Sequence, residues 1–212
     1  MTGRRALLLA LVLVVGLAGG FATSWVLGEN PPGSGAAAPV AAASPSLPVD
    51  PVPDVLADPD YPPLEPDVPL VDTVVGEGED FQMTVPAPEG WRMVPIALNE
   101  WQWRPDGQDQ SFGYVMRVEQ VLSNRRSIDW TLDRRVDELD EDEQGFEVVG
   151  QSGDGIHYTY ITNNHLRHGY LAWVDLTGSD NAQVEIAVTG RRVDQSGLAD
   201  LVARVADGVR LG

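Results

Sequence analysis

Residues 182–191 read AQVEIAVTGR, and this stretch alternates apolar with polar side chains. In an extended strand Val184, Ile186 and Val188 fall on one face, whereas Gln183 and Glu185 fall on the other. A strand with one apolar face is typical of an antiparallel sheet that is covered on one side. The stretch therefore predicts an antiparallel sheet with a packed layer against it.

Further strands are expected on the N-terminal side of this stretch. Runs of β-branched and aromatic residues occur there between turns of Gly, Asn, Asp and Ser. We expect strands at residues 81–85, 91–94, 100–104, 113–121, 146–150, 156–162 and 166–176. We expect the strands at 146–150, 156–162, 166–176 and 182–191 to form an antiparallel meander.

Two segments have the helical period instead. Apolar residues recur every three to four positions from Ile128 to Leu139, behind Ser127 as an N-cap. A second amphipathic helix is expected over 198–209, capped by Asp194 or Ser196 and ending near Gly208. The predicted fold class is α+β, a twisted antiparallel sheet packed by two helices.

The folded domain is expected to span residues 78–212. Ahead of it, 12 of the 16 prolines lie between Pro31 and Pro69, in a stretch rich in Ala, Val and Asp. Such a chain buries too little apolar surface to offset its ordering entropy. We therefore predict a disordered Pro-rich tether over residues 29–77.

Residues 1–28 are predicted to be a signal-anchor transmembrane segment. Arg4 and Arg5 precede an uncharged run at residues 6–27, which as a helix spans roughly 33 Å, one hydrocarbon core. The two arginines place the N-terminus in the cytoplasm and the domain outside the membrane. A cleaved signal peptide is the alternative, cut after Ala22 or Ala43, and the protein would then be secreted.

Composition narrows the function classes. The chain has no cysteine, which excludes disulfides, thiol nucleophiles, cysteine-ligated metals and a lipidated cysteine. Its net charge of −18 argues against nucleic acid as a partner, because phosphate binding needs a basic patch. All 14 basic residues are Arg, which is typical of GC-rich genomes such as those of actinobacteria.

A family resemblance is carried by the beginning and the end of the domain. The entry strand 81–85 runs through Pro86 to Gly90-Trp91, and the strand at 184–188 leads into the last helix. This order resembles the PsbP-like fold and the LpqN-type secreted lipoproteins of actinobacteria. The resemblance implies a non-enzymatic envelope protein, although this chain lacks the lipidated cysteine of those lipoproteins.

Tryptophans are the candidate binding residues. Trp101 and Trp103 are two apart on an expected strand, so both side chains point to one face, and Trp91 precedes them on the neighbouring strand. These rings could line a groove for a lipid, glycan or peptide. Packing in the core is the alternative interpretation.

Catalytic, cofactor and metal sites are not predicted. His157, His165 and His168 are interpreted as residues of a polar turn or exposed strand, because a structural zinc site needs three or four ligands. The acidic run 137–143 is interpreted as a solvated helix end, and Asp154 as a turn residue. No hydrolase or nucleotide-binding motif occurs.

The sequence thus predicts an extracytoplasmic accessory or binding protein of the bacterial cell envelope. Its expected contacts are the membrane, through residues 6–27, and another envelope protein or an apolar ligand. An exported hydrolase using two carboxylates in one cleft is the first alternative. A purely structural envelope domain is the second.

Overall fold

The computed structural model describes residues 54–78, 82–108 and 113–212. The predicted membrane segment, most of the predicted tether and Phe81 of the first expected strand lie outside these residues. No helix within the described ranges is long and apolar enough to cross a membrane.

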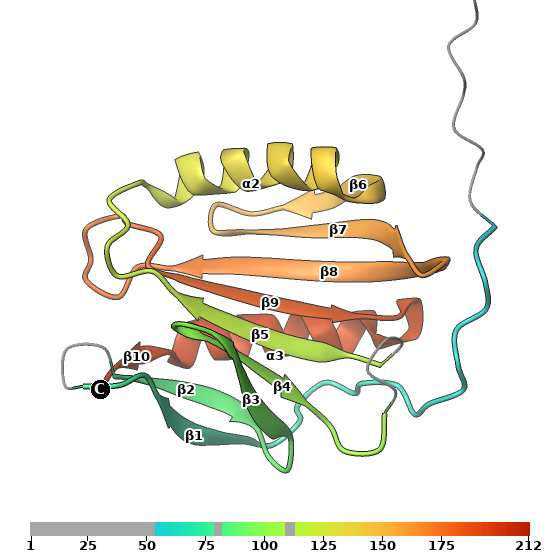
Figure 1. The fold of residues 1–212 in the computed structure, drawn as a ribbon, viewed down its shortest axis with the longest axis horizontal. Coiled ribbons are helices and arrows are strands. Elements are labelled where there is room, and N and C mark those ends of the chain that lie inside the picture. The colour runs from blue at the N-terminus through green and yellow to red at the C-terminus, as the bar shows by residue number, and fades with distance from the viewer. Residues whose placement is uncertain (1–53, 79–81, 109–112) are drawn as a thin grey trace, which may run out of the picture. The chain divides into compact units, whose positions relative to one another are not determined.

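Seven antiparallel strands form the main sheet, in the order β3-β4-β5-β9-β8-β7-β6 (Figure 1). Each strand pairs with its neighbour in antiparallel register, which confirms the predicted meander at the C-terminal side. The strands are β3 (Arg92–Ala97), β4 (Glu100–Arg104), β5 (Val115–Gln120), β6 (Gln144–Gln151), β7 (Gly155–Thr162), β8 (His165–Val174) and β9 (Val184–Gly190).

A smaller sheet of three strands packs beside it. It contains β1 (Leu70–Val75), β2 (Met83–Pro88) and β10 (Arg210–Leu211), with β2 in the middle. Neither β1 nor β10 was predicted, because β1 lies among the tether prolines and β10 is two residues long. Buried residues of β2, including Met83 and Val85, join the same core as the main sheet.

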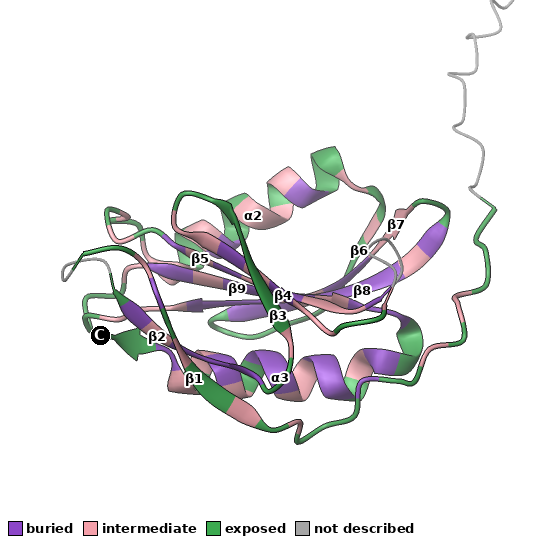
Figure 2. Ribbon diagram, turned by 60° about the horizontal axis from the view of Figure 1, so that its bottom comes forward, coloured by how far each residue is buried: buried purple, intermediate pink, exposed green. Residues whose placement is uncertain are grey.

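Two helices lie on opposite sides of the main sheet (Figure 2). Helix α2 (Ile128–Asp142) packs Leu132 and Leu139 against β7 and β8, and the N–H of Trp130 donates to the predicted cap Ser127 at 3.3 Å. Helix α3 (Gln195–Gly208) follows a short 3-10 turn, η1 (Arg192–Asp194), and packs Leu198, Leu201 and Val205 into the larger core. The α+β class with two helices is confirmed.

The folded part begins earlier than the predicted boundary at residue 78. Leu64 is buried, and its N–H donates to Asp194 Oδ1 at 2.9 Å. The guanidinium of Arg191 donates to the carbonyls of Pro59, Tyr61 and Pro62 at 2.9–3.0 Å. A Pro-rich segment lacks a hydrogen-bond ladder of its own, so its carbonyls are free to accept from a buried arginine. Residues 54–75 therefore belong structurally with the domain.

Candidate functional site

An apolar groove of about 530 Å³ lies between the end of β1 and the β3–β4 hairpin. Among the described residues, Glu77 is the one charged residue in its lining, and the cavity volume falls within the range typical of ligand sites. The lining consists of Val74, Val75, Gly76 and Glu77 on one side and Met93, Pro95, Ala97, Leu98, Asn99 and Trp101 on the other.

The register of β3 and β4 places these side chains on one face. Met93 pairs with Trp103 and Pro95 pairs with Trp101, so Met93 and Pro95 share the face of the two tryptophans. Asn99, at φ +60°, turns the chain between the strands. The turn leaves Leu98 91% exposed, and every residue of β3 is exposed. An apolar surface left in water in this way is typical of a binding site.

The three predicted tryptophans have different places. Trp101 lines the groove, with 8% of its surface exposed. Trp103 is 1% exposed and lies in the core, which is the alternative interpretation of its pattern. Trp91 stacks on Tyr114, with ring centroids 5.4 Å apart, and does not line the groove. Sequence reasoning missed Met93, Pro95, Ala97 and Leu98, although the uncharged apolar run 93–98 was a usable signal.

A buried amide lies beside the groove. Gln120 is 3% exposed, and neither polar atom of its side chain has a hydrogen-bond partner in the part of the chain that the structure describes. The backbone N–H of Gln120 donates to the backbone carbonyl of the groove residue Asn99 at 2.9 Å. The alternation of β5 puts its side chain on the same sheet face as Val118, which pairs with Trp101. Such an amide needs water or a ligand to satisfy it.

Gln120→Met is expected to raise the free energy of unfolding by about 1–3 kcal/mol, because methionine keeps the length and removes the unsatisfied polar atoms. Gln183→Met is the matched control. Gln183 is also buried, but its Oε1 accepts from the N–H of Leu176 at 3.0 Å, so its loss should destabilise the fold. Urea unfolding measures the free energy of unfolding of both variants. Equal losses of stability in the two variants would contradict the assignment of Gln120 as an unsatisfied buried amide.

Carboxylates also meet on the opposite face of the main sheet. Glu100, Glu119 and Glu185 are in register across β4, β5 and β9. Arg117 contacts all three, at 2.7 Å, 3.9 Å and 2.5 Å respectively. Burial and the charge of Glu185 raise the pKa of Glu119. Since one guanidinium engages every acid of the row, the geometry is that of a partly buried ion-pair network.

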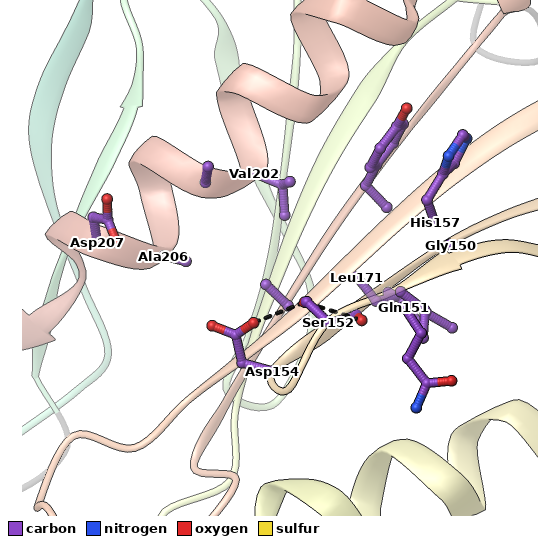
Figure 3. A pocket seen from close by; sticks show the side chains of 14 residues that line it. Gly150, Gln151, Ser152, Asp154, His157, Leu171, Val202, Ala206 and Asp207 are labelled. Carbon is purple, nitrogen blue, oxygen red and sulfur yellow. Dashed lines mark hydrogen bonds between the residues drawn. The ribbon is translucent and has the colours of Figure 1, made fainter.

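A second cavity, of about 330 Å³, lies beside helix α3 and contains serine, histidine and acid (Figure 3). Ser152 Oγ is 2.9 Å from Asp154 Oδ1 and 3.2 Å from the carbonyl of Gly155. In Figure 3 a dashed line leads from Ser152 to Asp154 and none leads to His157. A nucleophilic serine needs hydrogen-bond contact with its base, and here the serine closes a turn instead. Asp154 thus lies in the turn predicted for it.

The histidines are less exposed than predicted. His165 and His168 are both buried, so the interpretation as an exposed strand was wrong, because β8 is an interior strand with both faces covered. His157 Nε2 and His168 Nδ1 are 3.1 Å apart, and His168 Nε2 is 3.1 Å from the Gln195 amide nitrogen. Within the described ranges, no group of three or more His, Asp or Glu could hold a metal ion.

The His157–His168 pair predicts a loss of stability in mild acid. Burial lowers the pKa of both imidazoles, and the pKa of His168 is lowered further by the charge of His157. The unfolded chain, with a pKa of about 6.5, therefore takes up protons first as the pH falls. Stability should be full above about pH 6.5 and decline below it.

The double variant His157→Gln/His168→Gln is expected to weaken this pH dependence. Urea unfolding at about pH 7.5 and about pH 5.5 measures it, in a window above the titration of most carboxylates. An unchanged difference between the two pH values would show that other groups cause the acid sensitivity.

Comparisons with known proteins give a weak structural likeness. No protein family model matches the chain, and no curated protein matches it. Among solved structures it is similar to LpqN, involved in cell envelope biogenesis of Mycobacterium tuberculosis, at 13% identity and a TM-score of 0.38. The likeness covers 66% of this chain and 90% of that one. A likeness at this level assigns neither family nor activity.

Proposed function

We propose that this chain is a membrane-anchored, extracytoplasmic binding protein of the bacterial cell envelope. Its folded domain holds an apolar ligand or a segment of another envelope protein in the groove beside Trp101. The observation that carries the proposal is the groove itself, which joins a cavity of about 530 Å³ to an apolar hairpin exposed to water.

Binding is supported by the energetics of the exposed hairpin. Leu98, Ile96 and Val94 project from the β3–β4 hairpin with 91%, 46% and 39% of their surfaces exposed. Each Å² of apolar surface removed from water contributes roughly 25 cal/mol, so covering this hairpin is favourable. The chain carries a net charge of −18, and an uncharged surface within so acidic a protein stands out as a contact site.

The location is supported by the N-terminal sequence. The uncharged run 6–27 is long enough to span a bilayer, and Arg4 and Arg5 precede it on the side that stays in the cytoplasm. The residues that follow, up to the described part, are rich in Pro and carry no basic group. Such a segment places a binding domain at a distance from the membrane surface.

Affinity purification of the tagged full-length protein from detergent-solubilised membranes tests the proposal, with mass spectrometry of proteins and lipids. Protease treatment of intact spheroplasts tests the location in parallel.

We expect the domain to be digested from outside and a protein or lipid to co-purify. Leu98→Lys should remove that companion, whereas Val149→Lys, an exposed valine at the opposite sheet edge, should not. A protected domain, or companions unchanged by Leu98→Lys, would overturn the proposal.

A further inference from the structure

We infer that the occupant of the groove is an extended peptide segment of a partner protein, which adds as a strand to the open edge of β3. Its alternate apolar side chains enter the groove, and a basic residue lies near Glu77. This inference rests on the proposed function, because it names the kind of ligand that the same groove binds.

The edge of β3 is available for pairing. β3 is the first strand of the seven-stranded sheet, and among the described residues it pairs with β4 alone. All six of its residues are exposed. The backbone groups that face away from β4 therefore have no strand partner, and an edge of this kind is a template for another extended chain.

The groove lies where the side chains of an added strand would go. Met93 and Pro95 alternate along β3 on the face of Trp101 and Trp103, and Ala97, which follows the register shift, also lines the groove. A strand beside β3 directs every second side chain to that same face. There the end of β1, at Val74 and Val75, forms the opposite wall. Backbone pairing thus supplies affinity, and the groove selects apolar side chains at alternate positions.

Polar features of the site favour a peptide over an acyl chain. Asn99 lies in the lining of the groove, and a peptide backbone offers its amide the donors and acceptors that a hydrocarbon lacks. Glu77 is the single charge that the described part of the chain contributes to the lining, and the chain as a whole has a net charge of −18. This charge repels anionic lipid headgroups and attracts a Lys or Arg on the partner.

The same edge resists pairing with a second copy of the chain. Pro95 has no N–H to donate, and the register of β3 and β4 shifts between Pro95 and Ala97. Both features shorten the stretch that pairs regularly, which is how natural proteins protect an edge strand from uncontrolled association. A partner must match this short register, so the occupant is a specific segment.

Selection of peptides from a random phage-displayed library on the full-length protein in detergent tests the inference. We expect enriched peptides with alternating apolar residues and a Lys or Arg. Met93→Lys should lower their affinity at least about tenfold, as expected when a central contact is lost, and Val149→Lys should leave it unchanged. Met93 and Val149 are both exposed apolar residues, and each lies on an edge strand of the main sheet. Thermal unfolding should therefore show that both variants are folded.

Two further measurements separate strand addition from side-chain binding. An enriched peptide should protect the amides of residues 92–97, apart from Pro95, from hydrogen exchange. Its analogue with N-methyl groups at alternate amides should bind at least about tenfold more weakly, because it cannot complete the ladder.

Several results would overturn the inference. The inference is wrong if no peptide is enriched, or if the enriched peptide binds Met93→Lys as tightly as it binds the parent protein. It is also wrong if the N-methyl analogue binds as tightly as the unmodified peptide. Self-association that Met93→Lys abolishes, or a co-purified lipid that displaces the peptide, would contradict it as well. The proposed function is contradicted by different results: protection of the domain from protease in intact spheroplasts, or co-purification of proteins and lipids that Leu98→Lys does not change. A lipid companion lost in Leu98→Lys would keep the proposed function and remove the peptide.

Discussion

Asp194→Ala is expected to lower the free energy of unfolding by about 3–5 kcal/mol, the cost of leaving a buried charge without its partner. Asp194 and Arg191 are both fully buried, and the two carboxylate oxygens accept from the guanidinium at 2.8 Å and 2.9 Å. The substitution leaves Arg191 buried and also removes the acceptor for the N–H of Leu64. Urea unfolding of the variant and the parent protein measures the difference.

Glu138→Ala provides the control for this prediction. Glu138 pairs with Arg134 at 3.0 Å on the surface of helix α2, and an exposed pair of this kind contributes at most about 1 kcal/mol. Hydrogen exchange should also separate the two variants, since only Asp194→Ala releases residues 59–64. A loss for Asp194→Ala no larger than that for Glu138→Ala would show that the Arg191–Asp194 pair does not hold this segment.

The Arg191–Asp194 pair also holds the N-terminal part of the described chain against the domain. Arg191 comes directly before η1 and α3, and it donates to three carbonyls of residues 59–62. Farther toward the N-terminus, the N–H of Leu56 donates to the carbonyl of Asn164 in the β7–β8 turn at 2.7 Å. The chain therefore enters the domain at this turn, whereas the groove is formed by the β3–β4 hairpin and the end of β1.

Local patterns were enough to predict most of the regular structure. The alternation at 182–191 gave β9, and the period behind Ser127 gave α2, because both signals come from neighbours in the sequence. Arg134 and Arg135 both contact Glu138 of the acidic run at the end of α2. Each of these interactions spans four residues or fewer.

Interactions between distant residues could not be predicted in this way. Asp194 was expected to cap the last helix, and it stands at the N-cap position without a capping hydrogen bond from its side chain. Its carboxylate instead binds Arg191 and Leu64, which lies 130 residues away. The groove has the same origin, because it joins β1, within the predicted tether, to a hairpin that follows much later in the chain. Only pairing in space reveals that Trp101 lines it and Trp103 does not.

Trp103→Ala is expected to lower the free energy of unfolding by about 3–5 kcal/mol, the usual cost of deleting a large aromatic side chain from a core. Trp103 is 1% exposed and packs in the core shared by β2, β5 and α3. Trp130→Ala is the control: Trp130 is 49% exposed on α2, and its cation–π contact with Arg126 contributes at most about 1 kcal/mol.

Trp101→Phe then tests whether the two tryptophans of β4 differ in role, with Trp101 lining the groove and Trp103 packing in the core. Phenylalanine keeps an aromatic ring in the core and shortens the wall of the groove, so the fold should persist while the companion captured from membranes is reduced. Trp103→Phe, on the same face two residues away, should cost stability without changing capture by the folded protein. If the two Phe variants capture the companion equally well at matched folded fraction, Trp101 contributes to the core alone, and the binding surface must lie on the exposed hairpin.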